Sequence, residues 1–526
     1  MFLKQGEELL LGLDLGISTA KATLFNAHGA LLNFETQEYL ILPQGEKVEA
    51  DPETYWKPVA ASIRRLLTKW GGDPQQIRAV SVASHTETVI PLDHSGQPVR
   101  PALVWMDARS QPEADELLKT IGLARVLQIS GQPDINPIWP ITKFRWMAKN
   151  EPDKLRQTAT FLLPEEYLLY RLCGRFVAEQ TEWSSSLVLD IRSKRWSEEM
   201  LEFAGISAAQ LPEICPPGVA IGQISEDCAR ETGLSRNTRV VTGAIDQVCS
   251  AIAAGNIAPG IVTESTGSVL ALLATVSEPV FDLEARIPCH IHALPDTYCL
   301  LPWNPSGGLV LKWFKDNFVS VTEFSSTAGD LYGQLTAEAE NVAPGCDGLI
   351  VLPHLQGALF PEYNDTARGV FFGITLTHRR AHFVRAIMEA ISFLIRRDLQ
   401  GLNRLGAGAQ EIRVLGGGAR SRFWSQIKAD VCKVRVVVPA QSEAAALGAA
   451  ILAAVGSGVY KDIPSAVREM SKIKEIIEPN RIKADVYDAA FRLYVRLYDA
   501  VKDSYSECRQ IADASRKLRD TSVQVE

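Results

Sequence analysis

The 526-residue sequence lacks several features that mark common classes of protein. No uninterrupted apolar run reaches the ~18 residues that a membrane-spanning helix needs. Residues Met1 to Glu8 do not place a basic region before an apolar one, as a signal peptide does. The net charge of −8 gives no electrostatic reason to expect nucleic acid or an anionic membrane as a partner. We therefore expect a cytoplasmic protein that acts on small molecules.

Patterned cysteines and two common nucleotide-binding signatures are also missing. The nine cysteines lie singly between Cys173 and Cys508, with no C-x-x-C pair, which disfavours a zinc site and fits a reducing compartment. No G-x-x-x-x-G-K-[ST] occurs, which excludes an ordinary P-loop. The glycine turn Gly416–Gly418 lacks G-x-G-x-x-G spacing, which disfavours nicotinamide binding.

One arrangement of predicted elements occurs twice along the chain. The first pass has strands at Leu9–Leu13, Ala22–Phe25 and Leu31–Tyr39, a helix at Pro52–Trp70, and strands at Ile77–Ser84 and Thr88–Leu92. The second has strands at Ile261–Glu264 and Ser268–Thr275, a helix at Phe383–Leu399, a strand at Ile412–Leu415, a helix at Ser421–Val431 and a strand at Val434–Val438. This order mixes hairpins with crossovers and differs from a dinucleotide-binding βαβ alternation. We expect an α/β fold with two domains, 9–256 and 257–460, facing each other across a cleft.

The remaining segment, 461–526, is charged and helical in pattern. A short helix is predicted at Pro464–Lys472 and a long one at Asp485–Leu518, with aromatic residues and leucine at helical spacing. The simplest interpretation of the long segment is a docking helix followed by a frayed tail. A contact in a homodimer is the alternative.

Two turns could hold phosphate groups. The first, Asp14 to Lys21, combines a carboxylate, a glycine turn, hydroxyls and a cation within eight residues, as expected if the acid holds Mg²⁺. An ordinary hairpin turn with a solvated lysine is the alternative. The second, Thr263 to Ser268, offers hydroxyls and a glycine but no cation. Such turns present backbone N–H groups to anions, so the pair suggests a polyphosphate held between two halves.

Asp246 is the candidate general base. It follows an apolar run that ends at Val241, so it should lie at the end of a strand, where ligands of α/β folds gather. An aspartate there could accept the proton of an attacking alcohol during phosphoryl transfer. Its alternative role is capping a helix that starts at Gln247.

Six ordered segments resemble the FGGY carbohydrate kinases. They are Asp14–Lys21, Val104–Arg109, Gly243–Gln247, Thr263–Ser268, Gly369–Gly373 leading to Glu389, and Gly416–Ser421. The resemblance covers about residues 9–460. It implies two ribonuclease H-like domains of the actin and hexokinase type, with ATP and a sugar in the cleft. It also implies catalysis, although a non-catalytic sugar sensor of the same fold is the alternative.

By this resemblance, each segment has an expected role. Asp246 would be the base, Gln247 would help to hold the sugar, and Asp14 would organise Mg²⁺. Residues expected to contact the phosphates or the nucleotide are Ser18, Thr19, Lys21, Thr266, Gly267, Gly308, Gly417, Gly418 and Arg422. Residues expected to line the sugar site are Thr86, Glu87, Trp105 and Asp107, although Trp105 could equally be a core residue.

The substrate pattern is divided between subfamilies. Ala83–Glu87 lies where xylulokinases resemble G-Q-M-H-G, but Glu87 resembles the glutamate of the glycerol kinase sequence Q-R-E-T. Thr86 replaces the arginine of that sequence, and Ile138 replaces a tyrosine that helps to bind glycerol. Leu355–Pro361 lacks the Glu-Arg pair typical of xylulokinases, whereas Gly369–Gly373 and Gly416–Ser421 resemble them. The resemblance implies a kinase for a ketopentose such as xylulose, with ribulose, arabitol, erythritol and glycerol-like polyols as alternatives.

Overall fold

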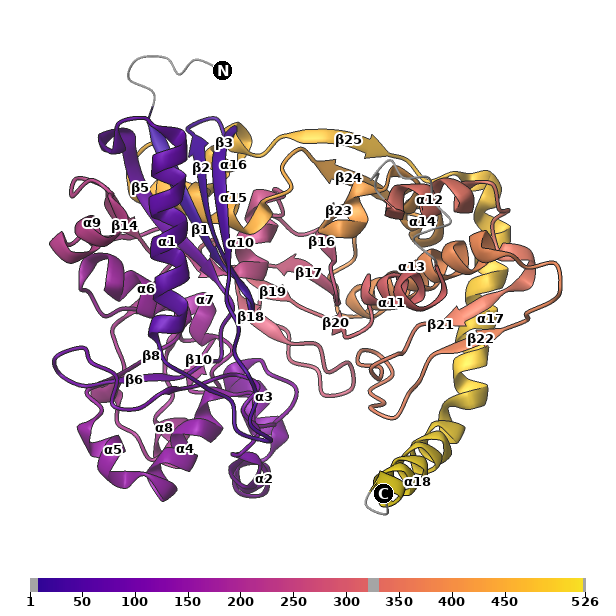
Figure 1. Cartoon of the computed structure of the whole chain (residues 1–526), viewed down its shortest axis with the longest axis horizontal. Helices are drawn as coiled ribbons and strands as arrows, with labels where there is room; N and C mark the ends of the chain where they lie inside the picture. Colours follow the sequence, from indigo (N-terminus) through magenta and orange to yellow (C-terminus); the bar gives the residue numbers. More distant parts are fainter. Residues whose placement is uncertain (1–7, 320–330, 524–526) are drawn as a thin grey trace. The chain divides into compact units, whose positions relative to one another are not determined.

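The computed structural model describes residues 8–319 and 331–523, and its contacts divide the chain into two compact units (Figure 1). The first unit comprises Met1–Pro259, Thr275–Leu301 and Pro439–Lys472, and the second comprises Gly260–Ala274, Pro302–Val438 and Ile473–Glu526. The units therefore interleave along the chain, whereas the predicted ranges 9–256, 257–460 and 461–526 are consecutive. The interleaving arises because packing onto a sheet, rather than chain order, decides which segments belong together.

The first unit is built on a mixed sheet in the order β13-β14-β5-β1-β2-β3. Its strands are β1 (Leu9–Leu15), β2 (Thr19–Asn26), β3 (Leu31–Glu38), β5 (Ile77–Ser84), β13 (Ala220–Gln223) and β14 (Arg239–Val241). Strands β1, β2 and β3 are antiparallel, whereas β1 and β14 both run parallel to β5. A short strand, β15 (Ala244–Ile245), continues the pairing with the end of β5.

Helices cover both faces of this sheet, as the alternation of side chains along β1 requires. Leu11 and Leu13 join a buried core with Tyr55 and Ile63 of α1 (Glu53–Trp70). Gly12, between the two leucines, faces the other side, where a Cβ would lie 1.9 Å from the carbonyl oxygen of Ala446. That oxygen belongs to α15 (Ala444–Gly456), which also packs on α10 (Asp246–Ala253).

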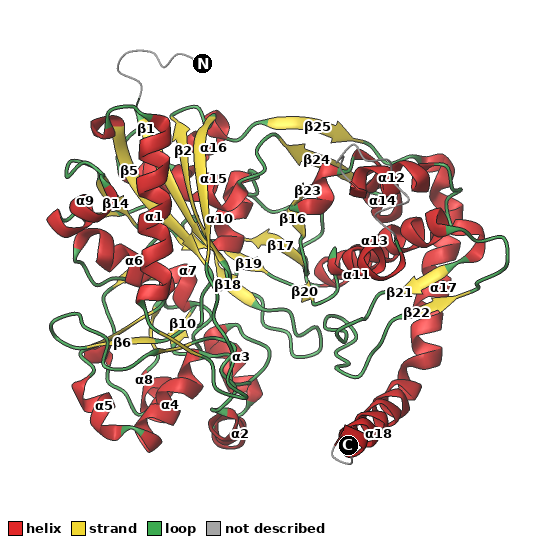
Figure 2. Ribbon diagram, viewed as in Figure 1, coloured by secondary structure: helices red, strands yellow, loops and turns green. Residues whose placement is uncertain are grey.

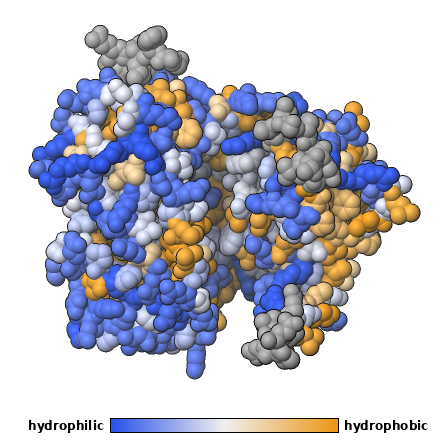
Figure 3. Space-filling view, in the orientation of Figure 1, coloured by the Kyte–Doolittle hydropathy of each residue, from blue (hydrophilic) through white to orange (hydrophobic). Residues whose placement is uncertain are grey.

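The rest of the first unit consists of short elements (Figure 2). Its other helices are α2 (Gln111–Thr120), α3 (Leu123–Ser130), α4 (Pro140–Asn150), α5 (Pro152–Gln157), α6 (Pro164–Cys173), α7 (Gln180–Trp183), α8 (Glu198–Ala204), α9 (Glu226–Thr232) and α16 (Ile463–Met470). Its paired short strands are β4 (Glu49–Ala50) with β7 (Ala102–Leu103), β6 (Ile90–Leu92) with β8 (Thr160–Leu162), β9 (Ala178–Glu179) with β12 (Ile214–Cys215), β10 (Leu189–Asp190) with β11 (Arg195–Trp196), and β18 (Cys289–Ile291) with β19 (Tyr298–Leu300). The surface of this unit that Figure 3 shows is predominantly hydrophilic.

The sheet of the second unit has a similar pattern of strand pairing and includes strands in the order β17-β16-β23-β24-β25. The strands are β16 (Ile261–Thr266), β17 (Leu270–Val276), β23 (Glu411–Leu415), β24 (Arg435–Pro439) and β25 (Ile473–Ile477), and β20 (Trp303–Asn304) also pairs with β17. As β1 does in the first unit, β16 forms a hairpin with the next strand and runs parallel to a later one, β23. The predicted duplication is thus present in the strand pairing.

In the second unit, the long helix α13 (Arg380–Arg404) packs against α11 (Leu309–Phe318), α12 (Leu331–Glu340), α14 (Arg422–Cys432) and α17 (Ala484–Val501). The last helix, α18 (Tyr505–Val523), contacts the turn that follows α17, and a small hairpin pairs β21 (Ile350–Leu352) with β22 (Val370–Phe372). Among the helices of the described ranges, none is long and apolar enough to cross a membrane.

Two predictions for the last 66 residues are wrong in detail. The predicted helix at 485–518 is two helices, which a short 3-10 turn at Lys502–Ser504 separates. The segment also contains a strand, β25, which is mostly exposed and carries Lys474 and Glu475 at the edge of the sheet. The sequence did not predict this strand because charged residues are common on edge strands, and they interrupt the alternation of apolar and polar residues that identifies a half-buried strand.

Candidate active site

The first of the two predicted phosphate turns lies between β1 and β2, and its two charged residues are neighbours. Asp14 and Lys21 are directly opposite each other in the antiparallel register. Burial raises the pKa of the Asp14 carboxyl to about 6, while Lys21 lowers this pKa and Glu443 raises it. Ser18 is exposed and Thr19 is partly exposed at this turn.

Lys21 has a partner that the sequence did not indicate. Its ammonium group forms an ion pair with Glu443, the residue that precedes α15. Because the two residues are more than 400 positions apart, no local pattern could have connected them. The cation expected to face the phosphates is therefore held by a carboxylate that packing on β1 brings to the turn.

Asp246 is the first residue of α10 and directly follows β15. Gly243 allows this placement, because a Cβ there would lie 1.6 Å from the carbonyl oxygen of Val82 in β5. The Asp246 side chain is partly exposed, and the residue before it occupies the capping position. Burial raises the pKa of the Asp246 carboxyl to about 7, Asp14 raises it further, and the backbone N–H of Gln247 lowers it.

Glu87 is a second partly exposed acid on the same unit, three residues beyond the end of β5. Its φ of 64° lies in the left-handed region, which is unusual for a residue other than glycine. Burial raises the pKa of the Glu87 carboxyl to about 7; a hydrogen bond from Ser185 and the charge of Lys143 lower it, and Asp246 raises it. Asp14, Asp246 and Glu87 therefore form a continuous series of interacting carboxyl groups.

Lys143 is a buried cation beside Glu87 that sequence reasoning did not single out. Its ammonium group donates to the carbonyl oxygens of Pro137 at 2.6 Å and Ile138 at 2.7 Å. Burial lowers the pKa of Lys143 to about 7, although Asp107 and Glu87 raise it. A lysine in the apolar pattern of α4 was the available signal, since it lies between Thr142 and Phe144.

Other residues expected at the sugar site have different surroundings. The Asp107 side chain is fully buried and binds Arg109 at 2.7 Å and the backbone N–H of Val48 at 2.7 Å. Thr86 is 2% exposed and donates to the carbonyl oxygen of Glu182 at 3.1 Å. Trp105 is partly exposed and packs against the core, and Gln247 is partly exposed beside Asp246.

In the second unit, glycines bring three turns together around Thr266. Gly308 donates its backbone N–H to the carbonyl oxygen of Gly267 at 2.8 Å, and a Cβ on Gly418 would lie 2.8 Å from the Cβ of Thr266. Gly267 and Gly417 are exposed beside them. These turns present bare backbone at the end of β16 and β23, as a phosphate or nucleotide site needs.

A buried cation, Lys428, lies against the second turn. Its ammonium group lies 2.5 Å from Glu264 and 3.0 Å from the Thr266 hydroxyl, and both charged side chains are fully buried. Lys428 lies four residues after the buried Trp424 on α14, so a lysine on the core-facing side of a helix was the missed signal. Arg422, expected near the nucleotide, is 69% exposed and pairs with Glu475 at 2.7 Å.

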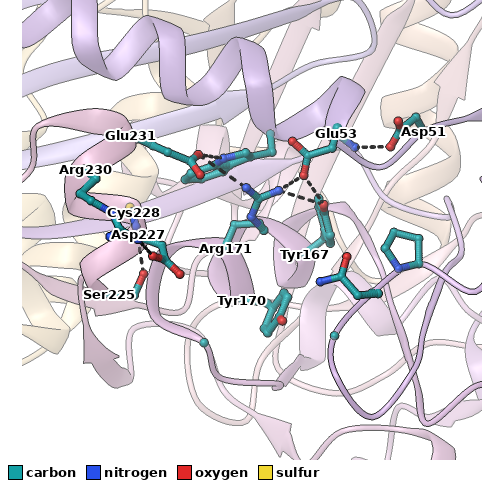
Figure 4. Close-up of a pocket in the computed structure, with 15 residues that line it drawn as sticks. Asp51, Glu53, Tyr167, Tyr170, Arg171, Ser225, Asp227, Cys228, Arg230 and Glu231 are labelled. Carbon is teal, nitrogen blue, oxygen red and sulfur yellow. Dashed lines mark hydrogen bonds and ion pairs between the residues drawn. The ribbon is translucent and has the colours of Figure 1, made fainter.

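A separate pocket of about 610 Å³ lies in the first unit among α1, α6 and α9 (Figure 4). Arg171 stands over the ring of Trp56 at 4.8 Å and pairs with Glu53 and with Glu231. None of the predicted site residues lines this pocket. Because none of those residues reaches it, we do not place the chemistry there.

Known proteins match nearly the whole chain. The model of the FGGY family of carbohydrate kinases, N-terminal domain, matches residues 9–253, and that of the C-terminal domain matches residues 267–457. The xylulose kinase of Bacillus subtilis (strain 168) is 28% identical over 94% of this chain and 97% of its own length. The gluconokinase of the same organism is 30% identical over 97% of this chain and 98% of its own.

Solved structures show the same fold. A ligand-bound xylulose kinase from Lactobacillus acidophilus matches with a TM-score of 0.85 at 24% identity, covering 95% of this chain and 99% of its own. Together with the two family matches, which run in order along the chain, this confirms the resemblance and the predicted α/β fold. The chain is a carbohydrate kinase and belongs to the FGGY family.

Proposed function

We propose that this kinase transfers the γ-phosphoryl group of ATP to a hydroxyl of a neutral ketose or polyol, with a ketopentose such as xylulose as the best candidate. The proposal depends mainly on the position and the raised pKa of the Asp246 carboxyl. It is a partly exposed carboxyl with a pKa raised to about 7, at the end of the central sheet of the first unit. A base with a pKa near the working pH can accept a proton from an attacking hydroxyl most effectively.

The two phosphate turns supply the remaining parts of the proposed reaction. Ser18, Thr19 and Lys21 in the first unit, and Thr266, Gly267 and Gly418 in the second, offer hydroxyls, backbone N–H groups and a cation to ATP. Phosphoryl transfer depends on such positioning and charge neutralisation. Gly308 and Gly417 would lie against the nucleotide, and Arg422 would have to leave Glu475 to join them.

Asp14 is the proposed residue for Mg²⁺, the metal of this chemistry. The described residues contain no group of three or more His, Cys, Asp or Glu side chains that could hold a metal ion. Mg²⁺ fits such a site, because it usually binds through one or two carboxylates together with substrate phosphates and waters. When bound, the metal would neutralise charge on the phosphate oxygens.

The charges of the first unit favour a neutral substrate over an aldonate. Glu87 and Asp246 raise the electrostatic cost of a third negative group, and Lys143 already donates to two backbone carbonyl oxygens. Glu87 and Gln247 can instead accept or donate hydrogen bonds to sugar hydroxyls, with Trp105 as an apolar wall. The gluconokinase relative makes gluconate the competing substrate, and a sensor that binds without turnover is the remaining alternative.

A substrate panel in an ADP-release assay tests the proposal. We expect turnover with a neutral sugar among D-xylulose, D-ribulose, L-xylulose, arabitol, erythritol and glycerol, and at least tenfold lower kcat/KM with D-gluconate. Glu87→Gln is the matched variant, because it removes one negative charge while keeping the side chain's shape. A wild-type preference for gluconate would refute the neutral-substrate proposal, and bound nucleotide without any turnover would favour the sensor.

The pH dependence of kcat/KM follows from the proposed base. Asp246 must be ionised to accept a proton, and its pKa is about 7. We therefore expect kcat/KM to rise about tenfold per pH unit below this pKa and to level off above it. Initial rates between pH 5.5 and 8.5 measure the profile, with an exposed acid variant, Asp227→Asn, as the control. A flat profile across pH 6 to 8 would contradict the assignment.

A further inference from the structure

Four glutamates lie buried next to the segment Gly243–Ile245, the loop and short strand that directly precede Asp246. Glu165 and Glu166 come from α6, Glu179 from β9 and Glu182 from α7, and each has 0% exposure. We call these residues the glutamate cluster. None of them has a place in the proposed phosphoryl transfer, and four carboxyl groups in one core are costly unless they are protonated or hydrogen-bonded.

The cluster is bonded to the loop at two positions before Asp246. The backbone N–H of Gly243 donates to Glu165 Oε1 at 2.7 Å. The backbone N–H of Ile245 donates to Thr181 Oγ1 at 3.0 Å, and this hydroxyl in turn donates to Glu179 Oε2 at 2.5 Å. The loop is thus held by side chains on one side and by the pairing of β15 with Ala83 and Ser84 of β5 on the other.

A third bond connects the cluster to the second acid of the site. The Thr86 hydroxyl donates to the carbonyl oxygen of Glu182 at 3.1 Å, and Thr86 directly precedes Glu87. Glu182 and Thr181 are consecutive residues of α7. The short helix α7 therefore contacts both the segment that leads to Asp246 and the segment that contains Glu87.

Burial favours the protonated forms of the four carboxyl groups in the cluster. Burial raises the pKa of Glu166 to about 7 and that of Glu179 to about 8, and the carboxyl groups of Glu165 and Glu182 have pKa values well above the usual range for the same reason. The titratable groups that face the cluster from α10 and β12 are the thiols of Cys249 and Cys215, whose pKa values burial also raises. Within the described ranges, Glu165 Oε2 and both carboxyl oxygens of Glu182 accept no hydrogen bond within 3.5 Å.

We propose that Thr181 and Glu165 are positioning residues for the general base, holding the Gly243–Ile245 loop so that the Asp246 carboxyl stays in line with the substrate hydroxyl. The inference rests on the proposed function of Asp246. Neither residue is proposed to touch the substrate. Their effect comes from geometry, since a displacement of about 1 Å of a reacting group can cost on the order of 100-fold in rate.

Thr181→Val is the sharpest test, with Thr181→Ser as its matched control. Valine has the shape of threonine but leaves the Ile245 N–H without an acceptor, whereas serine keeps the hydroxyl. We expect Thr181→Val to lower kcat by about 10- to 100-fold, with the KM for ATP within about twofold of wild type, and Thr181→Ser to restore most of the rate. Equal kcat values for the two variants would overturn the proposal.

A second pair of variants, at Glu165, tests the same proposal if the Thr181→Val protein does not fold. Glu165→Gln keeps an oxygen that can accept from Gly243, whereas Glu165→Leu removes it. We expect the glutamine variant to keep most of the wild-type kcat and the leucine variant to lose it by a similar factor, without a change in the KM for ATP. A rise in the KM for ATP with unchanged kcat would overturn the positioning role.

Combining Thr181→Val with Asp246→Asn separates this inference from the proposed function. If Thr181 acts through the base, adding Thr181→Val to Asp246→Asn should lower the residual rate by less than threefold. A full additional loss would show that Thr181 acts independently of the base and would overturn the inference while leaving Asp246 in its role. Wild-type enzyme that phosphorylates no sugar of the panel would refute the proposed function, and the inference with it.

Discussion

Asp246→Asn is expected to lower kcat by about 10²- to 10⁴-fold, the range typical of a lost general base. Asparagine keeps the size of the side chain and the contact with the Gln247 N–H, but it cannot accept a proton at neutral pH. Because the Asp246 side chain is only partly buried and the capping position is occupied by Ile245, the fold should tolerate the change. Steady-state ADP release with the best panel substrate gives kcat and both KM values.

The control for this variant is Asp227→Asn. Asp227 lies in the same unit at the pocket of Figure 4, and its side chain is 77% exposed. It should keep the wild-type kcat, so that removal of a carboxylate from the unit is separated from removal of the base. A kcat for Asp246→Asn within about threefold of wild type would show that another group accepts the proton.

Lys428→Ala is expected to destabilise the protein by about 3–5 kcal/mol, the usual effect of removing one partner of a buried ion pair. The change would leave the Glu264 carboxylate buried with the Thr266 hydroxyl as its remaining hydrogen-bond donor. Glu264 lies in β16, two residues before Thr266, so the turn proposed to bind phosphate should itself lose order. Urea unfolding, followed by fluorescence, measures the shift in the midpoint.

Two further variants make this prediction specific. The double change Lys428→Met with Glu264→Gln removes both charges and should recover most of the lost stability, since a neutral pair of similar volume has no uncompensated charge. Arg422 lies on the same helix as Lys428, and its exposed pair is with Glu475 of β25. Arg422→Ala breaks this pair and should change stability by less than about 1 kcal/mol. A Lys428→Ala midpoint equal to that of Arg422→Ala would refute the importance of the buried pair.

The hairpins and the central helices could be predicted because their patterns are local. Strand Ile77–Ser84 has the predicted bounds, and the helix predicted at Pro52–Trp70 begins one residue later, at Glu53. The turn after β1 and the glycine turn at Gly416 are also where the strands end. Apolar periodicity was sufficient to predict these elements, and glycine residues were sufficient to predict where the strands end, because both signals depend on local sequence.

The partners of the site residues could not be predicted in the same way. Lys21 pairs with Glu443, and the segment before Asp246 is bonded to Thr181 and Glu165. The two residues of each of these pairs are 64 to 422 positions apart. Asp107 was expected to accept sugar hydroxyls, but its carboxyl binds Arg109 and Val48. Which acids stay accessible depends on long-range packing, and periodicity contains no information about it.

By itself, the sequence determined the class of chemistry: two similar strand-and-turn patterns, an acid after a strand, and the absence of a P-loop and of dinucleotide spacing. The tertiary structure decided which charges are available. It buries Lys428 against Glu264, occupies Asp107 and Lys143 with internal bonds, and leaves Asp246 and Glu87 partly exposed with raised pKa values. The physical reason is that desolvation and hydrogen-bond partners, which set the state of an ionisable group, are properties of the folded surroundings and not of the residue type.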